Sequence, residues 1–193
     1  MKRLFEGKTA FRLLALFAFA CAICFANCAA FDLFAAAPDD KPDDFAVDYT
    51  FANGSVPPPH HYKYNLKIAS NGAAEIALTP GYDEKAVAIW TKQFAVAPER
   101  LDDLYQTLRA NRFFARDWRQ TEEPITGGSR RSLSIKANAR RYALEDYVIA
   151  DQREAAANVF AAIESVVPPA IRDEMTARQE RYEADYKAGK VAP

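Results

Sequence analysis

The sequence predicts an α+β domain in which an antiparallel sheet carries helices on one face. Three observations lead to this fold class. Several short segments before residue 97 alternate apolar and polar residues, an apolar stripe at helical spacing follows them, and a second alternating pair then precedes two more helical segments. We expect a β-meander of about four strands, a helix, a β-hairpin, a helix and an extra C-terminal helix.

The meander is predicted by four segments and the turns between them. Residues 47–51 and 62–68 alternate with period two, as half-buried strands do. Asn71-Gly72 is typical of a tight hairpin turn, because both residues tolerate positive φ, and residues 74–78 return as the partner strand. Residues 87–96 predict a longer fourth strand, in which Trp90 belongs to the core.

The first helix is expected to begin at Pro98, where the missing N–H costs least. Its apolar positions fall at i, i+3, i+4 and i+7 and form one stripe facing the sheet: Leu101, Leu104, Tyr105 and Leu108. Phe113 and Phe114 are expected to cap the core where this helix ends.

A second hairpin is expected to begin near Leu133 and to turn near Asn138. Asp151 and Glu154 have the spacing of a capping box, which predicts a helix that Pro168-Pro169 ends. A final helix is predicted over residues 170–187.

The N-terminal 30 residues have the pattern of an export signal or a membrane anchor. A basic start is followed by 19 residues without charge, from Leu13 to Phe31. Cleavage before Phe31, lipid attachment at Cys28 and retention as an anchor all fit this pattern, so the protein is expected in the periplasm or cell envelope. All three cysteines lie in this segment, which excludes disulfides and thiolate metal sites from the domain that follows.

The rest of the chain divides by composition. Residues 31–45 contain PDDKPDD and are expected to form an acidic, extended linker. Residues 46–167 form the single α+β domain, and residues 168–193 are a helical extension.

Several of the strand, turn and helix motifs just described are similar to those of a known group of proteins. They are Tyr64-Asn65-Leu66-Lys67-Ile68, Asn71-Gly72, Pro80-Gly81-Tyr82, the helix 101–108 and Phe113-Phe114. Over roughly residues 46–149 the chain resembles uncharacterised exported proteins and lipoproteins of bacteria. The resemblance implies an envelope domain and supplies no catalytic residues.

Charge is unevenly distributed along the chain. Residues 109–141 carry nine Lys and Arg against three Asp and Glu, whereas the whole protein has a formal net charge of −1, which argues against nucleic-acid binding. Arginine clusters hold carboxylates, phosphates or anionic headgroups, and an exposed tryptophan anchors partners. The candidate binding residues are therefore Trp118, Arg116, Arg119, Arg130, Arg131, Arg140 and Arg141.

The arginine zone has an alternative interpretation, in which neighbouring acids such as Asp146 neutralise it. Packing against Phe113 or Phe114 is likewise the alternative to an exposed Trp118. If the second hairpin turns at Asn138, both arginine pairs are expected near its open end.

No catalytic, metal or cofactor pattern stands out. His60 and His61 are adjacent in an extended segment, so their side chains point to opposite faces and do not converge on a metal. The serines lack a nucleophile elbow, and adjacent acids such as Glu122-Glu123 lie in polar surroundings.

We therefore expect a non-enzymatic module that binds an envelope protein or an anionic surface through residues 113–131 and the neighbouring hairpin. The alternatives are a small exported hydrolase or carbohydrate-active enzyme that uses His61 or Glu123, and a secreted enzyme inhibitor.

Overall fold

The structure is a computed structural model that describes residues 39–82, 88–122 and 127–191. The predicted export signal, Cys28 and Glu123 lie outside the described residues. Within these ranges, none of the helices combines the length and the apolar character needed to span a bilayer.

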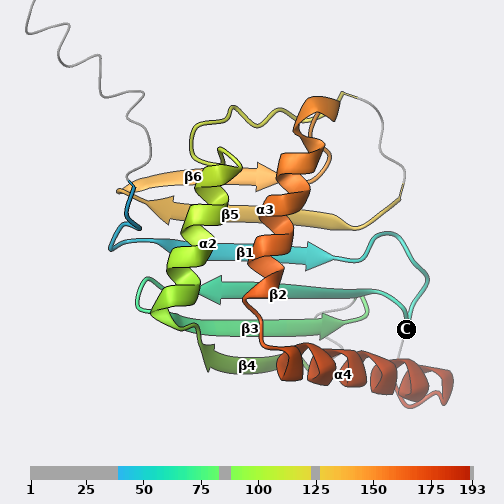
Figure 1. The fold of residues 1–193 in the computed structure, drawn as a ribbon. Helices are drawn as coiled ribbons and strands as arrows, with labels where there is room; N and C mark the ends of the chain where they lie inside the picture. The colour runs from blue at the N-terminus through green and yellow to red at the C-terminus, as the bar shows by residue number, and fades with distance from the viewer. Residues whose placement is uncertain (1–38, 83–87, 123–126, 192–193) are drawn as a thin grey trace, which may run out of the picture. The chain divides into compact units, whose positions relative to one another are not determined.

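The fold is α+β, with one antiparallel sheet and three long helices (Figure 1). The chain runs through β1 (Ala46–Ala52), β2 (Tyr62–Ile68), β3 (Ala73–Pro80), β4 (Trp90–Ala95), α2 (Pro98–Ala110), β5 (Arg130–Ala137), β6 (Arg140–Glu145), the 3-10 turn η2 (Ala150–Gln152), α3 (Arg153–Ser165) and α4 (Pro169–Lys187).

The sheet has six strands in the order β4-β3-β2-β1-β5-β6, rather than about four. The hairpin does not stand apart from the meander, because β5 pairs with β1 along its whole length, from Ala46 opposite Lys136 to Ala52 opposite Arg130. The first strand of the chain therefore lies inside the sheet, between β2 and β5.

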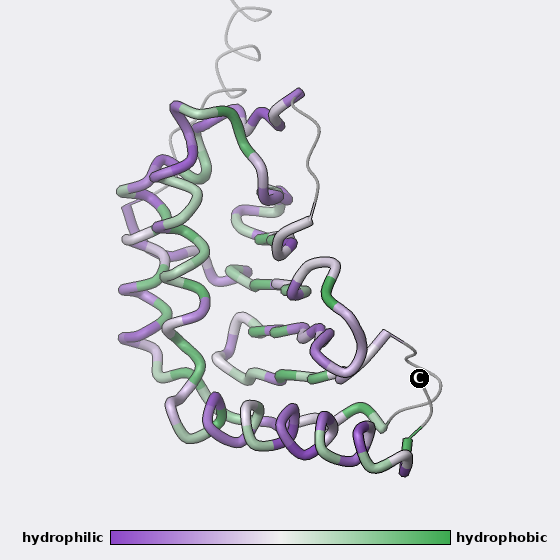
Figure 2. Tube along the Cα trace, turned by 90° about the vertical axis from the view of Figure 1, so that its right-hand side faces the viewer, coloured by the Kyte–Doolittle hydropathy of each residue, from purple (hydrophilic) through white to green (hydrophobic). Residues whose placement is uncertain are grey.

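One face of the sheet forms the core under α2 and α3. The buried strand residues share the same pleat, as Tyr49 does with its neighbours Leu66 and Leu133. Figure 2 shows both helices on one side of the strands, with their hydrophobic turns facing the sheet. The predicted stripe of α2 is confirmed, and α3 contributes Ala156, Val159, Phe160 and Ile163.

The opposite face of the sheet is polar. Its residues lie one position along from the core residues on each strand, and include Asp48, Thr50, Asn65, Lys67, Glu75 and Gln93. Asn65 ties this face together, because its Nδ2 donates to Asp48 Oδ1 (3.1 Å) and Thr50 Oγ1 (2.9 Å).

The described part of the predicted linker is docked on the domain. Asp39 pairs with Arg109 of α2, and Pro42 and Phe45 are buried. Asp44 accepts hydrogen bonds from the backbone N–H groups of Asn138 (2.7 Å) and Ala139 (2.8 Å) in the β5–β6 turn. Asp39 and Asp44, at the two ends of this acidic run, thus meet a cation and a pair of N–H donors.

The beginning of α3 also differs from the prediction. The helix starts at Arg153 after the turn η2, with Gln152 at the N-cap position and no side-chain cap hydrogen bond. The capping box expected from Asp151 and Glu154 is therefore wrong. Buried Gln152 is instead held by the loop that follows α2.

Candidate functional site

The two arginine pairs of the β5–β6 hairpin lie at opposite ends of it. The turn falls at Asn138 and Ala139 as predicted, but Arg140 pairs with Ala137 beside this turn, whereas Arg130 and Arg131 begin β5 at the open end. Arg141 lies opposite Lys136, which is five positions along β5 from Arg131, so even the nearer arginines of the two pairs are roughly 17 Å apart along the strand. The expectation that both pairs lie near the open end is wrong, because a strand that returns from a turn begins at the turn.

Successive side chains of a strand point to opposite faces of the sheet, so the two arginines of each pair also lie on different faces. Arg131 and Arg140 lie on the helix side of the sheet, whereas Arg130 and Arg141 lie on the polar side. Arg141 donates to Ser134 Oγ across the hairpin (3.1 Å). The four arginines therefore form no single patch.

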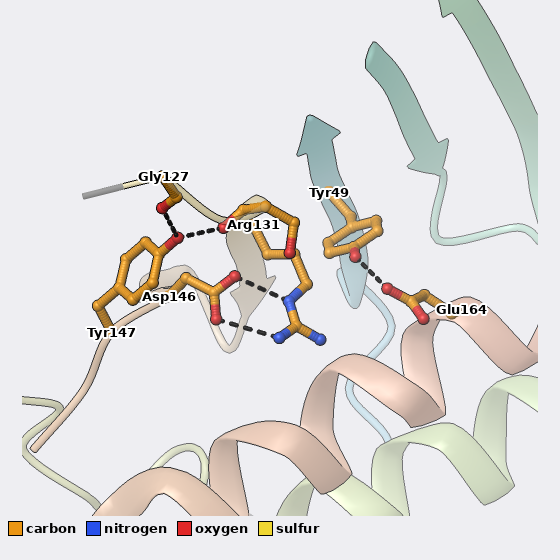
Figure 3. Close-up of polar contacts among 7 residues, drawn as sticks. Tyr49, Gly127, Arg131, Asp146, Tyr147 and Glu164 are labelled. Atoms are coloured by element: carbon orange, nitrogen blue, oxygen red, sulfur yellow. Dashed lines mark hydrogen bonds and ion pairs between the residues drawn. The ribbon is translucent and has the colours of Figure 1, made fainter. Parts of the chain in front are cut away.

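Arg131 is engaged within the fold (Figure 3). Its guanidinium makes a bidentate pair with Asp146, at 2.8 Å from Nε and 3.2 Å from Nη2, and lies 4.7 Å from the centre of the Phe160 ring. Asp146 thus neutralises one arginine of the zone, as the alternative interpretation expected.

Hydrogen bonds hold the loop that follows α2 against the rest of the domain. Trp118 is half-buried, its Nε1 donates to the Phe113 carbonyl (3.1 Å), and Arg116 lies over its ring at 5.2 Å. Buried Gln152 accepts from the Arg119 backbone N–H (2.9 Å) and donates to the Asp117 carbonyl (2.8 Å). The indole N–H that an anchor offers to a partner is already used inside the chain.

The two histidines take separate partners. His60 Nδ1 lies 3.1 Å from Glu183 Oε2 on α4, whereas the His61 ring stacks on Tyr82 with centroids 3.8 Å apart. Across the part of the chain that is described, no group of three or more His, Cys, Asp or Glu is arranged to hold a metal ion.

A pocket of about 360 Å³ lies between the sheet, the end of α3 and α4. Its floor is apolar and buried, and consists of Leu66, Ile76 and Leu78. Tyr62 and Tyr64 of β2 form one wall. The volume falls in the range of small-ligand sites, roughly 300–1,000 Å³. We call this feature the α4 pocket.

The α4 pocket exists because α4 has no apolar stripe to fill the space. The helix buries only Ile171 and Gln179. Its pocket-lining residues recur at i, i+3/i+4, i+7/i+8 and i+11, which places them on one face of a helix. They are Arg172, Met175, Thr176, Gln179, Glu180 and Glu183. Met175 packs against the core, but the rest of this face is polar and covers an apolar floor.

Contacts on both sides hold α4 over the sheet. Arg178 lies over the Trp90 ring at 4.9 Å, and Glu174 pairs with Lys92 at 3.2 Å. The Gln179 Nε2 donates to the Pro59 carbonyl at 2.8 Å. Because these contacts reach both β4 and the β1–β2 connection, the pocket is bounded on two sides by the same helix and its partners.

The aromatic wall continues behind the pocket. The Phe51 ring stacks on Tyr64 with centroids 5.1 Å apart, and the Tyr49 hydroxyl donates to Glu164 Oε1 at the end of α3 (Figure 3). Burial, and then the negative charge of Glu164, raise the pKa values of Tyr62 and Tyr64. Both phenols are therefore neutral and able to donate hydrogen bonds at neutral pH.

Gln179 contains an unsatisfied polar atom. Its side chain is only 8% exposed, and its Oε1 has no hydrogen-bond partner among the described residues. The Nε2 bond to Pro59 fixes which end of the amide is the acceptor. A buried acceptor without a donor costs about 1–3 kcal/mol. Because Oε1 itself has almost no accessible surface, a ligand in the pocket does not reach it in this conformation.

The sequence is without recognised relatives in two comparisons. No protein-family model matches it, and no curated protein does so either.

The residues of the α4 pocket were not singled out from the sequence. Tyr62 and Tyr64 fall in a predicted strand, and residues 168–193 are predicted only as a helical extension. One signal was present: a long C-terminal helix without a continuous apolar stripe follows strands that are rich in aromatic residues. Only the helix's position over β2 and β3 converts that signal into a pocket.

Proposed function

We propose that the chain is an exported, non-enzymatic binding domain of the cell envelope whose ligand site is the α4 pocket. One observation carries the choice of site. A cavity of about 360 Å³ has a buried apolar floor on β2 and β3 and is lined on the α4 side mostly by polar side chains.

The arginine zone supports a binding site less well. Arg131 is neutralised by Asp146, the two hairpin pairs lie at opposite ends, and the Trp118 indole is bonded inside the chain. The α4 pocket, by contrast, joins apolar contact area to a few polar groups that fix a ligand's orientation, as binding sites usually do.

The proposal of export rests on the basic start and the uncharged stretch in residues 1–31. Intact mass of the native protein from separated envelope fractions tests it. A chain that begins near Phe31, a chain lipidated at Cys28 or a full-length membrane form supports export. A full-length protein found only in the cytoplasm refutes it.

A ligand-observed NMR screen tests the binding site. We would screen the full chain against small amines, sugars, carboxylates and aromatic compounds, and repeat the hits with Thr176→Trp. Thr176 lies at the exposed rim, so the indole occupies the mouth of the pocket. The matched control is Ala177→Trp, at the next position of α4, which is exposed and does not line the pocket.

Hits that bind the wild type and the control variant, and are lost in Thr176→Trp, are the expected result. A screen without hits refutes the proposed site, and so do hits that Thr176→Trp leaves unchanged.

A further inference from the structure

We infer that the α4 pocket binds an organic cation, with an alkylammonium group held between carboxylates and tyrosine rings. This inference rests on the proposed function of the same pocket and adds the chemical class of its ligand. It follows from the charge of the lining and from the two tyrosines and the apolar floor beside it.

The charge of the pocket lining is negative. Three carboxylates, Glu164, Glu180 and Glu183, face a single guanidinium, that of Arg172, so the lining carries a net charge of −2. Arg172 is already engaged, because its Nη1 donates to the Val167 carbonyl at the end of α3 (2.5 Å). An anionic ligand would meet this potential unfavourably, whereas a cation is attracted.

Other charges near the lining reduce its negative charge without reversing it. Lys92 and Arg178 share the single carboxylate of Glu174, which does not line the pocket, so these three residues carry a net charge of +1. Arg131 is bound to Asp146, and His60, which faces Glu183, is counted as neutral.

The aromatic wall suits a cation as well. The faces of tyrosine rings attract ammonium groups within about 6 Å, and more strongly where water is excluded. Tyr62 and Tyr64 line the pocket together with Glu164, and Phe51 stacks on Tyr64. The alkyl chain of the ligand has the apolar floor of Leu66, Ile76 and Leu78 to cover.

Isothermal titration of the full chain compares three probes with a five-carbon chain and one lysine derivative. Cadaverine presents a free alkylammonium, and 1,5-pentanediol is its neutral counterpart. Glutarate is the anionic counterpart, and Nα-acetyl-lysine N-methylamide presents the ammonium of a peptide lysine. We expect at least about tenfold tighter binding of one or both ammonium probes than of the diol, and no binding of glutarate. The tighter ammonium probe then distinguishes a free amine from a lysine side chain as the source.

A pair of variants on α4 separates the pocket charge from the overall charge. Glu180→Gln removes an exposed carboxylate that lines the pocket, and Asp173→Asn removes an exposed carboxylate that does not. We expect Glu180→Gln to weaken binding of the ammonium probe roughly three- to tenfold, and Asp173→Asn to change it by less than about twofold.

The inference is overturned if neither ammonium probe binds, if the diol binds as tightly, or if the two variants weaken binding equally. Thr176→Trp separates this failure from failure of the proposed function. Loss of screened or neutral ligands in Thr176→Trp leaves the pocket as the site and refutes only the preference for a cation. Binding that Thr176→Trp does not affect refutes both.

Discussion

Replacing Asp44 should destabilise the domain, because this residue holds the β5–β6 turn from outside the sheet. Its carboxylate accepts the backbone N–H groups of Asn138 (2.7 Å) and Ala139 (2.8 Å), both of which have positive φ, 53° and 57°. A turn with two such residues has the geometry of type I′, which favours Gly at the second position and makes Ala139 unfavourable. The cap thus stabilises a turn whose own sequence does not favour it.

The magnitude follows from the two hydrogen bonds. A net contribution of about 0.5–1.5 kcal/mol each is typical, and the lower half applies because Asn138 and Ala139 are exposed and water can replace the carboxylate. We expect Asp44→Ala to lower the free energy of unfolding by about 1–2 kcal/mol and Asp44→Asn by less, since one amide oxygen remains as acceptor. Ala139→Gly should raise it by about 0.5–1 kcal/mol.

The effect has a defined pH dependence. The Ala139 N–H first of all, and then the Asn138 N–H and Lys136, hold the pKa of Asp44 below its ordinary value of 3.8, against the opposing effect of burial. A carboxyl whose pKa is lower in the folded state stabilises the fold above its unfolded-state pKa, and this stability is lost as the pH falls through the folded-state pKa. The difference between the wild type and Asp44→Ala should therefore be constant near neutrality and shrink below about pH 4.

Urea denaturation of the full chain, in one buffer series for all variants, measures these differences. Lys41→Ala is a control within the same segment, because its pair with Asp102 is long (3.7 Å) and Asp102 is exposed, so it should cost less than about 0.5 kcal/mol. An Asp44→Ala variant as stable as the wild type, or a difference that does not diminish in acid, would refute this account of the turn.

Three further predictions concern contacts between elements. Tyr49→Phe removes the hydroxyl that joins β1 to Glu164 of α3. It should lower the free energy of unfolding by about 1 kcal/mol, because half-buried Glu164 regains water. An unchanged midpoint in urea denaturation would contradict this contribution of the hydrogen bond. Gly81→Ala should destabilise by about 1–3 kcal/mol, since φ is +72° and a Cβ there would lie 2.3 Å from the Tyr182 hydroxyl oxygen. Adding Tyr182→Phe should recover only part of that loss, because the ring carbon at 2.9 Å remains, and complete recovery would show that backbone strain is unimportant. In a Trp90→Phe background, iodide should quench Trp118 less in the folded than in the unfolded chain, because Trp118 is half-buried and bonded to Phe113; equal quenching would restore the exposed anchor.

The order of residues within a segment was sufficient to predict the elements whose structure depends on neighbouring residues alone. Alternation placed the strands of the sheet, Pro98 marked the start of α2, and the turn near Asn138 was expected from the chain between two strands. The number of strands in the sheet could not be predicted locally, because β5 joins the meander by pairing with β1, and the paired residues, from Ala52–Arg130 to Ala46–Lys136, are 78 to 90 positions apart in sequence.

The acidic segment shows where composition misleads. Taken alone, PDDKPDD is repelled by its own charges and extended. In the folded protein Asp39 meets Arg109 and Asp44 meets two backbone N–H groups, so the same charges attach the segment to the domain. The donors come from α2 and from the β5–β6 turn, which lie far along the chain.

The candidate site depended on tertiary structure for the same reason. The fold class, the buried face of the strands and the apolar stripe of α2 are predictable from the sequence, because side-chain periodicity fixes which residues leave water. The separation of the arginine pairs, and the burial of Gln179 with its oxygen unpaired among the described residues, follow instead from the packing of distant segments. The same packing places the polar face of α4 over an apolar floor. A pocket is formed where elements fail to fill the space between them, and that mismatch belongs to no single segment of the chain.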